Sequence, residues 1–144
     1  MSLQNEVKKS RSFLFRLPHG CDLLQELNRL CSENGITLGR LEAIGAVQSA
    51  QIGFYDQTTR VYEFMTLGRS LEIVKLTGNV SLKDGKPFVH AHIALADRDG
   101  TMYGGHLSEG TIVFACECLL ESFEGSRFER QPDSQTGLSL WSKA

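Results

Sequence analysis

Apolar residues recur along this chain with two periods, one typical of a helix and one typical of strands. The helical period is confined to one segment, where the apolar positions are Leu23, Leu24, Leu27, Leu30 and Cys31. Asp22, followed by Gln25 three residues later, is a typical N-terminal cap, and Asn34-Gly35 is a typical C-terminal signal. We therefore predict one helix between Asp22 and Asn34, packed on a sheet through a single apolar stripe.

Alternating apolar and polar residues predict strands over most of the remaining chain. The predicted strands cover residues 12–17, 36–50, 51–55, 60–66, 71–80, 87–96, 101–107 and 111–120. In the last of these we expect one face to carry Ile112, Phe114, Cys116, Cys118 and Leu120, with the two cysteines as small core residues. Residues 1–10 are expected to form a flexible tail and residues 125–137 a loop, before a short edge strand or docking segment at 138–142 anchored by Trp141.

The stretch from 87 to 107 contains three of the four histidines and the clearest hairpin turn. His90 and His92 are two residues apart in a predicted strand, so their side chains leave by the same face. A three-residue loop ending in Gly100 would pair Asp97 with Thr101. The numbers of paired residues then sum to 198, which sets His106 opposite His92. A two- or four-residue loop, or a bulge at Gly104-Gly105, would instead send His106 to the other face.

Three neutral imidazoles on one face of a hairpin form a candidate site for a divalent transition metal, and we expect zinc. Three histidine nitrogens at about 2.0–2.1 Å would leave a fourth coordination position for water or a ligand. The alternative is that His90, His92 and His106 are half-buried polar residues that are hydrogen-bonded to their neighbours on the sheet.

Three longer stretches resemble the plant and prokaryote conserved (PPC) domain family. They are FRLPHGCDLLQELNRLC (15–31), IGAVQSAQIGFYD (44–56) and LTGNVSLKDGKPFVHAHIALADRDGTMYGGHL (76–107), within a resemblance that runs from about Arg11 to Glu124. The resemblance implies an α+β domain with an antiparallel sheet and one main helix packed on it, assembled as a homotrimer. The histidine motif of the family falls on His90, His92 and His106, and bacterial relatives are labelled DNA-binding by similarity to plant AT-hook nuclear proteins.

Length and composition are those of one ordinary globular domain. The chain has 144 residues, of which 41% are hydrophobic and 22% charged. We divide it into the tail 1–10, a PPC-like domain 11–124 and the C-terminal segment 125–144. No apolar run is long enough to cross a membrane, and residues 1–10 lack the apolar core of a signal peptide. Four cysteines without a C-x-x-C spacing suggest a reduced, cytoplasmic setting.

The charge of the chain offers little general attraction to DNA. The formal net charge is −2, the isoelectric point is near 6.1, and no AT-hook is present. Two small basic groups, Lys8-Lys9 with Arg11 and Arg127 with Arg130, are expected to be a solvated terminus and a solvated loop. Two functions follow, a DNA-binding regulatory module as the family label implies, or a zinc-dependent hydrolase or lyase that acts on a small molecule.

Three further residues are candidates for a role beside the histidines. Glu117 lies among apolar residues in the last long strand, so it is the first candidate for a catalytic carboxylate, or else for an ion pair across a subunit interface. Glu72 is a second candidate base. Arg69 could hold a bound anion, although a salt bridge to a neighbouring subunit is an equal alternative.

Overall fold

The computed structural model describes residues 2–143, which form nine strands joined in one sheet and one short helix. The elements in chain order are β1 (Lys8–Leu17), α1 (Leu23–Glu33), β2 (Gly39–Asp56), β3 (Val61–Leu67), β4 (Leu71–Lys83), β5 (Lys86–Ala96), β6 (Met102–Leu107), β7 (Ile112–Glu124), β8 (Phe128–Pro132) and β9 (Ser139–Lys143). The structure is therefore mostly β, with a smaller helical part than the α+β expectation suggested. No helix within residues 2–143 is both long and apolar enough to cross a membrane.

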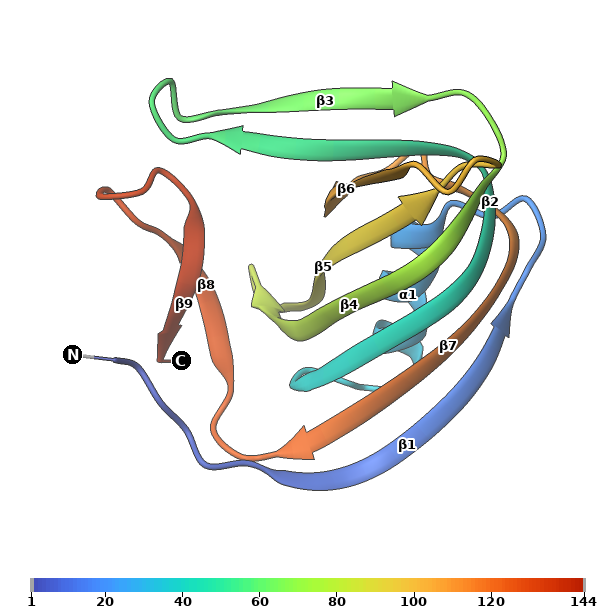
Figure 1. Ribbon diagram of the computed structural model, residues 1–144. Helices are drawn as coiled ribbons and strands as arrows, with labels where there is room; N and C mark the ends of the chain where they lie inside the picture. Colours follow the sequence, from blue (N-terminus) through green and yellow to red (C-terminus); the bar gives the residue numbers. More distant parts are fainter. Residues whose placement is uncertain (1, 144) are drawn as a thin grey trace.

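The 18-residue strand β2 organises the sheet because each of its halves has two neighbours. Its first half pairs with β7 and β4, and its second half pairs with β3 and β6. Strands β4, β5 and β6 are paired in turn, so the path from β2 through these strands returns to β2. The sheet consequently curls on itself, with α1 inside the curve (Figure 1). The predicted antiparallel arrangement is confirmed for every pair of named strands except the parallel contact of β4 with β8.

The helix forms where the apolar pattern predicts it. One carboxylate oxygen of Asp22 accepts a hydrogen bond from the Gln25 backbone N–H at 3.1 Å, which caps the N-terminus. The apolar stripe is buried against the sheet through Leu23, Leu27, Leu30 and Cys31. The side-chain amide oxygen of Asn28 accepts from the Val89 N–H at 2.9 Å, and this contact ties α1 to the strand that carries two of the histidines.

The face assignment predicted for the last long strand is correct at its centre and wrong at its start. Cys116 and Cys118 are buried core residues, as expected, but Phe114 is 58% exposed and Val113 is fully buried. The register between β2 and β7 moves from Ala46 opposite Ala115 to Val47 opposite Val113, which leaves Phe114 as the extra residue of a bulge. A bulge reverses the inside–outside alternation of the residues that precede it.

Both ends of the chain contain more regular structure than the sequence predicted. Strand β1 begins at Lys8, within the expected tail, and β8 lies within the expected loop 125–137. The edge strand expected near Trp141 is confirmed as β9, and the Trp141 ring stacks on Phe128 with ring centroids 4.7 Å apart. Strand β8 was missed because its partners are β9 and the distant β4. The β8–β9 hairpin lies beside the free end of the β2–β3 hairpin (Figure 1).

Candidate metal centre

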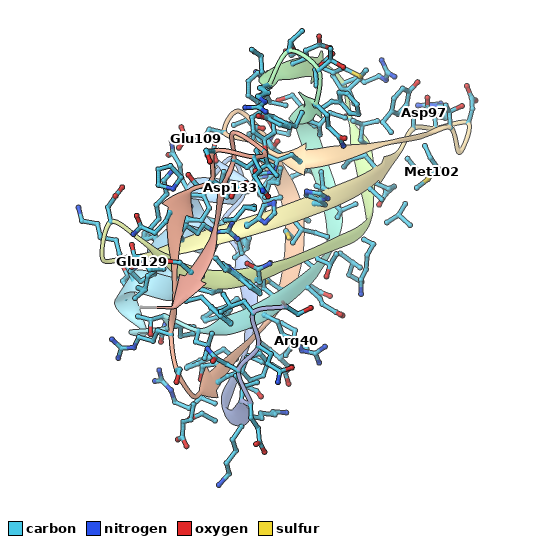
Figure 2. The ribbon with its side chains drawn as sticks, turned by 90° about the vertical axis from the view of Figure 1, so that its left-hand side faces the viewer. Arg40, Asp97, Met102, Glu109, Glu129 and Asp133 are labelled. Atoms are coloured by element: carbon cyan, nitrogen blue, oxygen red, sulfur yellow. The ribbon has the colours of Figure 1, made fainter. Side chains whose placement is uncertain are left out.

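The turn between β5 and β6 has the three-residue form that the sequence predicted. The Asp97 N–H donates to the Thr101 carbonyl at 3.0 Å, and the Gly100 N–H donates to the Asp97 carbonyl at 3.0 Å. Gly100 has φ +78°, a left-handed conformation that glycine adopts without strain. The Asp97 carboxylate accepts a further bond from the Thr101 N–H at 3.1 Å. Asp97 and Met102 mark this end of the hairpin in Figure 2.

The register that follows from this turn sets His92 directly opposite His106. The pairing continues without a shift from His92 and His106 to Ala96 and Met102, so no bulge forms at Gly104-Gly105. The predicted convergence of the three imidazoles is therefore confirmed as geometry. Their ring centroids are 5.1–5.7 Å apart, and one ring nitrogen from each histidine lies within 4.8 Å of the others.

Three strands hold the imidazoles in place. On the β4 side, Asn79 is opposite His90. On the β2 side, Gly53 is opposite His106. The ring of Tyr62, from β3, packs on the His106 ring with centroids 5.1 Å apart. Because β4, β2 and β3 are parts of the same curled sheet, the histidine positions are fixed by the main hydrogen-bond ladder of the domain.

The environment keeps two of the imidazoles neutral at pH 7. Burial, with a contribution from the Arg130 charge and the other two histidines, lowers the pKa of His90 to about 4. Burial also lowers the pKa of His106, assisted by His92 and Arg130. A neutral imidazole carries one nitrogen lone pair, and this is the form that binds a metal ion.

The His106 ring gives the clearest test of whether the residues fit a metal. Its Nδ1 atom is buried and has no hydrogen-bond partner among the described residues. A buried polar atom without a partner is costly, and a cation coordinated by its lone pair would remove that cost. Three nitrogens around a tetrahedral ion would be about 3.3–3.4 Å apart, so the imidazoles need only small side-chain rotations to close around one ion. The donor set therefore fits a zinc-like ion.

A cavity of about 610 Å³ opens above the histidines. One wall comes from the β2–β3 hairpin and another from the segment that joins β8 to β9. These two parts are held together by the Tyr55 hydroxyl, which donates to the Thr136 carbonyl at 2.8 Å, and by Arg60, which donates to the carbonyls of Ser134 and Gln135 at 3.1 and 3.0 Å. The site is thus a pocket of small-molecule size rather than an open sheet surface.

Sequence reasoning missed Arg130, which was grouped with Arg127 as part of a solvated loop. Arg130 is only 9% exposed, and its Nη2 atom lies 3.3 Å from Nδ1 of His90. It also lines a second cavity of about 400 Å³ that shares His90 and His106 with the first. The residue could not be found from local pattern because its position depends on the pairing of β8 with β4, about fifty residues earlier.

The other three predicted site residues are not brought to the histidines. Glu117 lines a separate cavity of about 480 Å³ together with Arg16 and Lys75. Glu72 lines a fourth cavity. Arg69 lies near the β5–β6 turn, with its guanidinium 3.9 Å from the Asp97 carboxylate and over the Tyr103 ring.

Acidification is expected to destabilise the metal-free domain through His90. The unfolded chain takes up a proton at His90 near pH 6.5, whereas the folded chain resists protonation until about pH 4. As far as His90 is concerned, the free energy of unfolding therefore has its full value above pH 6.5 and decreases as the pH falls toward 4. Urea unfolding of EDTA-treated protein at pH 7, 5.5 and 4.5 measures it, and His90→Asn should fall less steeply than the wild type. Equal slopes for the two proteins would contradict the assignment.

Comparison with known proteins gives the family and several close structural neighbours. The model of the Plants and Prokaryotes Conserved (PCC) domain, the family also written PPC, matches residues 4–124. A metal-containing protein from Archaeoglobus fulgidus is 44% identical, with a TM-score of 0.94 over 99% of this chain and 100% of that one. A PPC protein from Pyrococcus horikoshii is 37% identical, with a TM-score of 0.92 over 99% of both chains.

Two curated relatives are much longer than this chain. The Bifunctional protein GlmU of Synechococcus sp. (strain JA-3-3Ab) is 38% identical over 129 residues, which are 88% of this chain and 20% of that protein. The same protein from strain JA-2-3B'a(2-13) is 38% identical over 85% of this chain and 18% of its own length. The chain thus spans about a fifth of the length of these relatives. On the family match and the structural likeness together, the chain belongs to the Plants and Prokaryotes Conserved domain family.

Proposed function

We propose that His90, His92 and His106 bind one zinc ion and that the chain acts as a metal-dependent regulatory domain. The observation that carries the proposal is the convergence of three imidazoles, one nitrogen from each within 4.8 Å of the others, in which His106 also has a buried Nδ1 without a hydrogen-bond partner. The metal-containing neighbour from Archaeoglobus fulgidus supports it, since the two chains are alike over nearly their full lengths. A zinc ion there would act as a Lewis acid with one coordination position open to a ligand.

The lining of the two cavities favours ligand binding over hydrolysis or elimination. Among the described residues, no aspartate or glutamate lines either cavity that contains His90 and His106. The predicted bases Glu117 and Glu72 lie in other cavities. A hydrolase or lyase at this site would therefore lack a carboxylate base and would depend on the metal-bound water, on Lys83, on a tyrosine or on the substrate itself, and we keep this function as the alternative.

DNA-associated regulation is the second part of the proposal. Two structural neighbours, from Bacteroides thetaiotaomicron and Ralstonia eutropha, carry provisional DNA-binding designations at 25% and 28% identity. The charges on this chain favour such a role only weakly. Lys9 of β1 and Arg40 of β2 both pair with Glu121, at 2.8 and 2.6 Å, so part of their positive charge is already neutralised.

A homotrimer is proposed as the working assembly. Large apolar side chains remain exposed on the outer face of β1 and β2, with Leu14 85% and Ile44 55% exposed. The same face carries charges of both signs, including Arg16 and Glu117. Exposed apolar side chains bordered by charges are typical of surfaces that bind another protein chain.

We propose a reducing, cytoplasmic setting because none of the four cysteines forms a disulfide. All four are free, and Cys31, Cys116 and Cys118 are buried. Burial raises the pKa of each of these three thiols to about 12, so they carry little thiolate at neutral pH. They act as small core residues and have neither the arrangement of a disulfide framework nor that of a metal site.

Purified protein without an affinity tag is expected to contain about one zinc per chain. His92→Ala should lose most of this zinc, and because His92 is the most exposed of the three ligands, the variant should remain folded. Glu117→Gln is the matched control and should keep the metal, since Glu117 lines another cavity. Elemental analysis by mass spectrometry provides the measurement. Absence of stoichiometric metal after incubation with zinc would rule out the three-histidine site.

Retention on immobilised duplex DNA tests the DNA-associated role. We expect weak retention at about 50 mM salt and release before 200 mM, because few phosphates can be neutralised by a chain of net charge −2. Bovine serum albumin, another acidic protein, serves as the control for nonspecific retention. A chain that flows through at low salt as albumin does would leave metal-dependent ligand binding as the function.

Light scattering tests the assembly. A trimer of the 16.0 kDa chain would have a mass of about 48 kDa. Leu14→Glu, which sets a charge on the exposed apolar face, should shift the mass toward that of the single chain. Thr58→Glu, an exposed polar position in the turn between β2 and β3, is the control and should leave the mass unchanged. A wild-type mass near 16 kDa at micromolar concentration would exclude the trimer.

A further inference from the structure

Arg130 is a buried cation for which the fold provides no anion. Its contacts are with neutral groups, namely Ser81 Oγ from Nε at 3.1 Å, the Ser139 carbonyl from Nη1 at 3.0 Å, and Asn79 Oδ1 and His90 Nδ1 from Nη2 at 3.1 and 3.3 Å. Within residues 2–143, no carboxylate lies within ion-pair distance of it. Arginine is rarely buried without a carboxylate or phosphate to match its planar donors.

The buried position of the Arg130 guanidinium destabilises the folded protein as long as no ligand is bound. Arg130 is only 9% exposed, so its charge is poorly solvated, and burial accordingly lowers the pKa of the guanidinium. Its aromatic contacts, over the rings of Phe88 and Trp141, compensate only part of the lost hydration. A metal ion at the histidines would add a second positive charge beside the guanidinium, because Arg130 touches His90 directly.

The cavity lined by Arg130 and the larger cavity beside it both contain cationic and aromatic side chains. The second cavity is lined by Arg130, Lys83 and Arg60, and no acidic residue described in the structure reaches it. The rings of Tyr55 and Tyr62 form part of the wall in both cavities. A site with several cations, no acid and aromatic walls is complementary to a small molecule that has one anionic end and an apolar body.

We propose that the cavity lined by Arg130 binds a small organic anion, whose carboxylate or phosphate group would lie between Arg130 and the open position of the metal. The inference rests on the proposed zinc site, whose ligand it identifies by chemical class. Arg130 can still donate to an anion. Nη1 donates only one of its two N–H groups to the Ser139 carbonyl, and Nη2 would keep its bond to Asn79 Oδ1 after releasing His90. Arg130 follows the family-matched residues 4–124, so the C-terminal hairpin would supply the anion-binding residue to the three histidines.

The contact with His90 couples the anion to the metal. A guanidinium can only donate, so its bond to Nδ1 of His90 uses the lone pair on that atom and leaves the ring proton on Nε2. His90 must therefore release Arg130 before it can coordinate an ion, either through Nδ1 itself or through Nε2 after the ring proton has moved to Nδ1. An anion that attracts the guanidinium favours this release. By linkage, the anion then tightens zinc binding by the same factor by which zinc tightens anion binding.

Zinc affinity measured by competition with a chromophoric chelator, with and without the probe anion, tests the proposal. The probes are benzoate and phenylphosphonate, at constant ionic strength, with benzamide as the neutral molecule of the same shape as benzoate. We expect at least one of the two anions to tighten zinc binding about tenfold and benzamide to have no effect. The response to the two anions distinguishes a carboxylate ligand from a phosphate ligand.

Arg130→Gln and Arg127→Gln are the matched variants, because Arg127 belongs to the same segment but is exposed. Arg130→Gln should bind zinc with little dependence on the anion, whereas Arg127→Gln should behave as the wild type. If Arg130→Gln does not fold, Arg130→Lys keeps the charge without the planar donors and should retain a reduced coupling.

The outcomes separate this inference from the metal site on which it rests. Wild-type protein that binds no zinc would overturn the zinc site and with it the anion subsite. Zinc binding that neither anion changes, or that benzamide changes as much as benzoate, would overturn the anion subsite alone. Coupling that survives in Arg130→Gln at full strength would also overturn it.

Discussion

The pairing of His92 with His106 across β5 and β6 is the constraint on which the site depends. One residue more or fewer in the turn after Asp97 would move His106 to the opposite face, since side chains alternate along a strand. The turn is held by the left-handed conformation of Gly100 and by the Asp97 carboxylate. The centre is thereby built into the backbone ladder, where it does not depend on flexible loops.

The curled sheet converts this flat hairpin into a pocket. Strand β2 is long enough to pair with β4 and β7 in its first half and with β3 and β6 in its second half, and so it carries the β2–β3 hairpin over the histidines. Tyr55 and Arg60 then bond to backbone carbonyls of the β8–β9 connection. Because these bonds join two hairpins that are far apart in sequence, the pocket forms only when the whole domain has folded.

Three polar groups of the pocket share one property: each is at least partly buried, and the hydration that it loses is not fully replaced by contacts within the protein. His90 and His106 are kept neutral by desolvation, and Arg130 keeps a charge that no described acid balances. Each of these features has a cost to folding. A metal ion would use the imidazole lone pairs and an anion would balance the guanidinium, so the same environment that destabilises the empty pocket favours occupation of both positions. Unfavourable burial of polar groups is common at binding sites for this reason.

The sequence by itself determined the local features of this protein. The cap and stripe of α1, the turn at Gly100 and the shared face of the three histidines all follow from interactions between residues close along the chain. Only the tertiary structure decided the rest. The bulge at Phe114, the strand β8 and the position of Arg130 beside His90 depend on pairing between distant segments. A sequence pattern records which face a side chain takes, but it does not record which distant strand lies against that face.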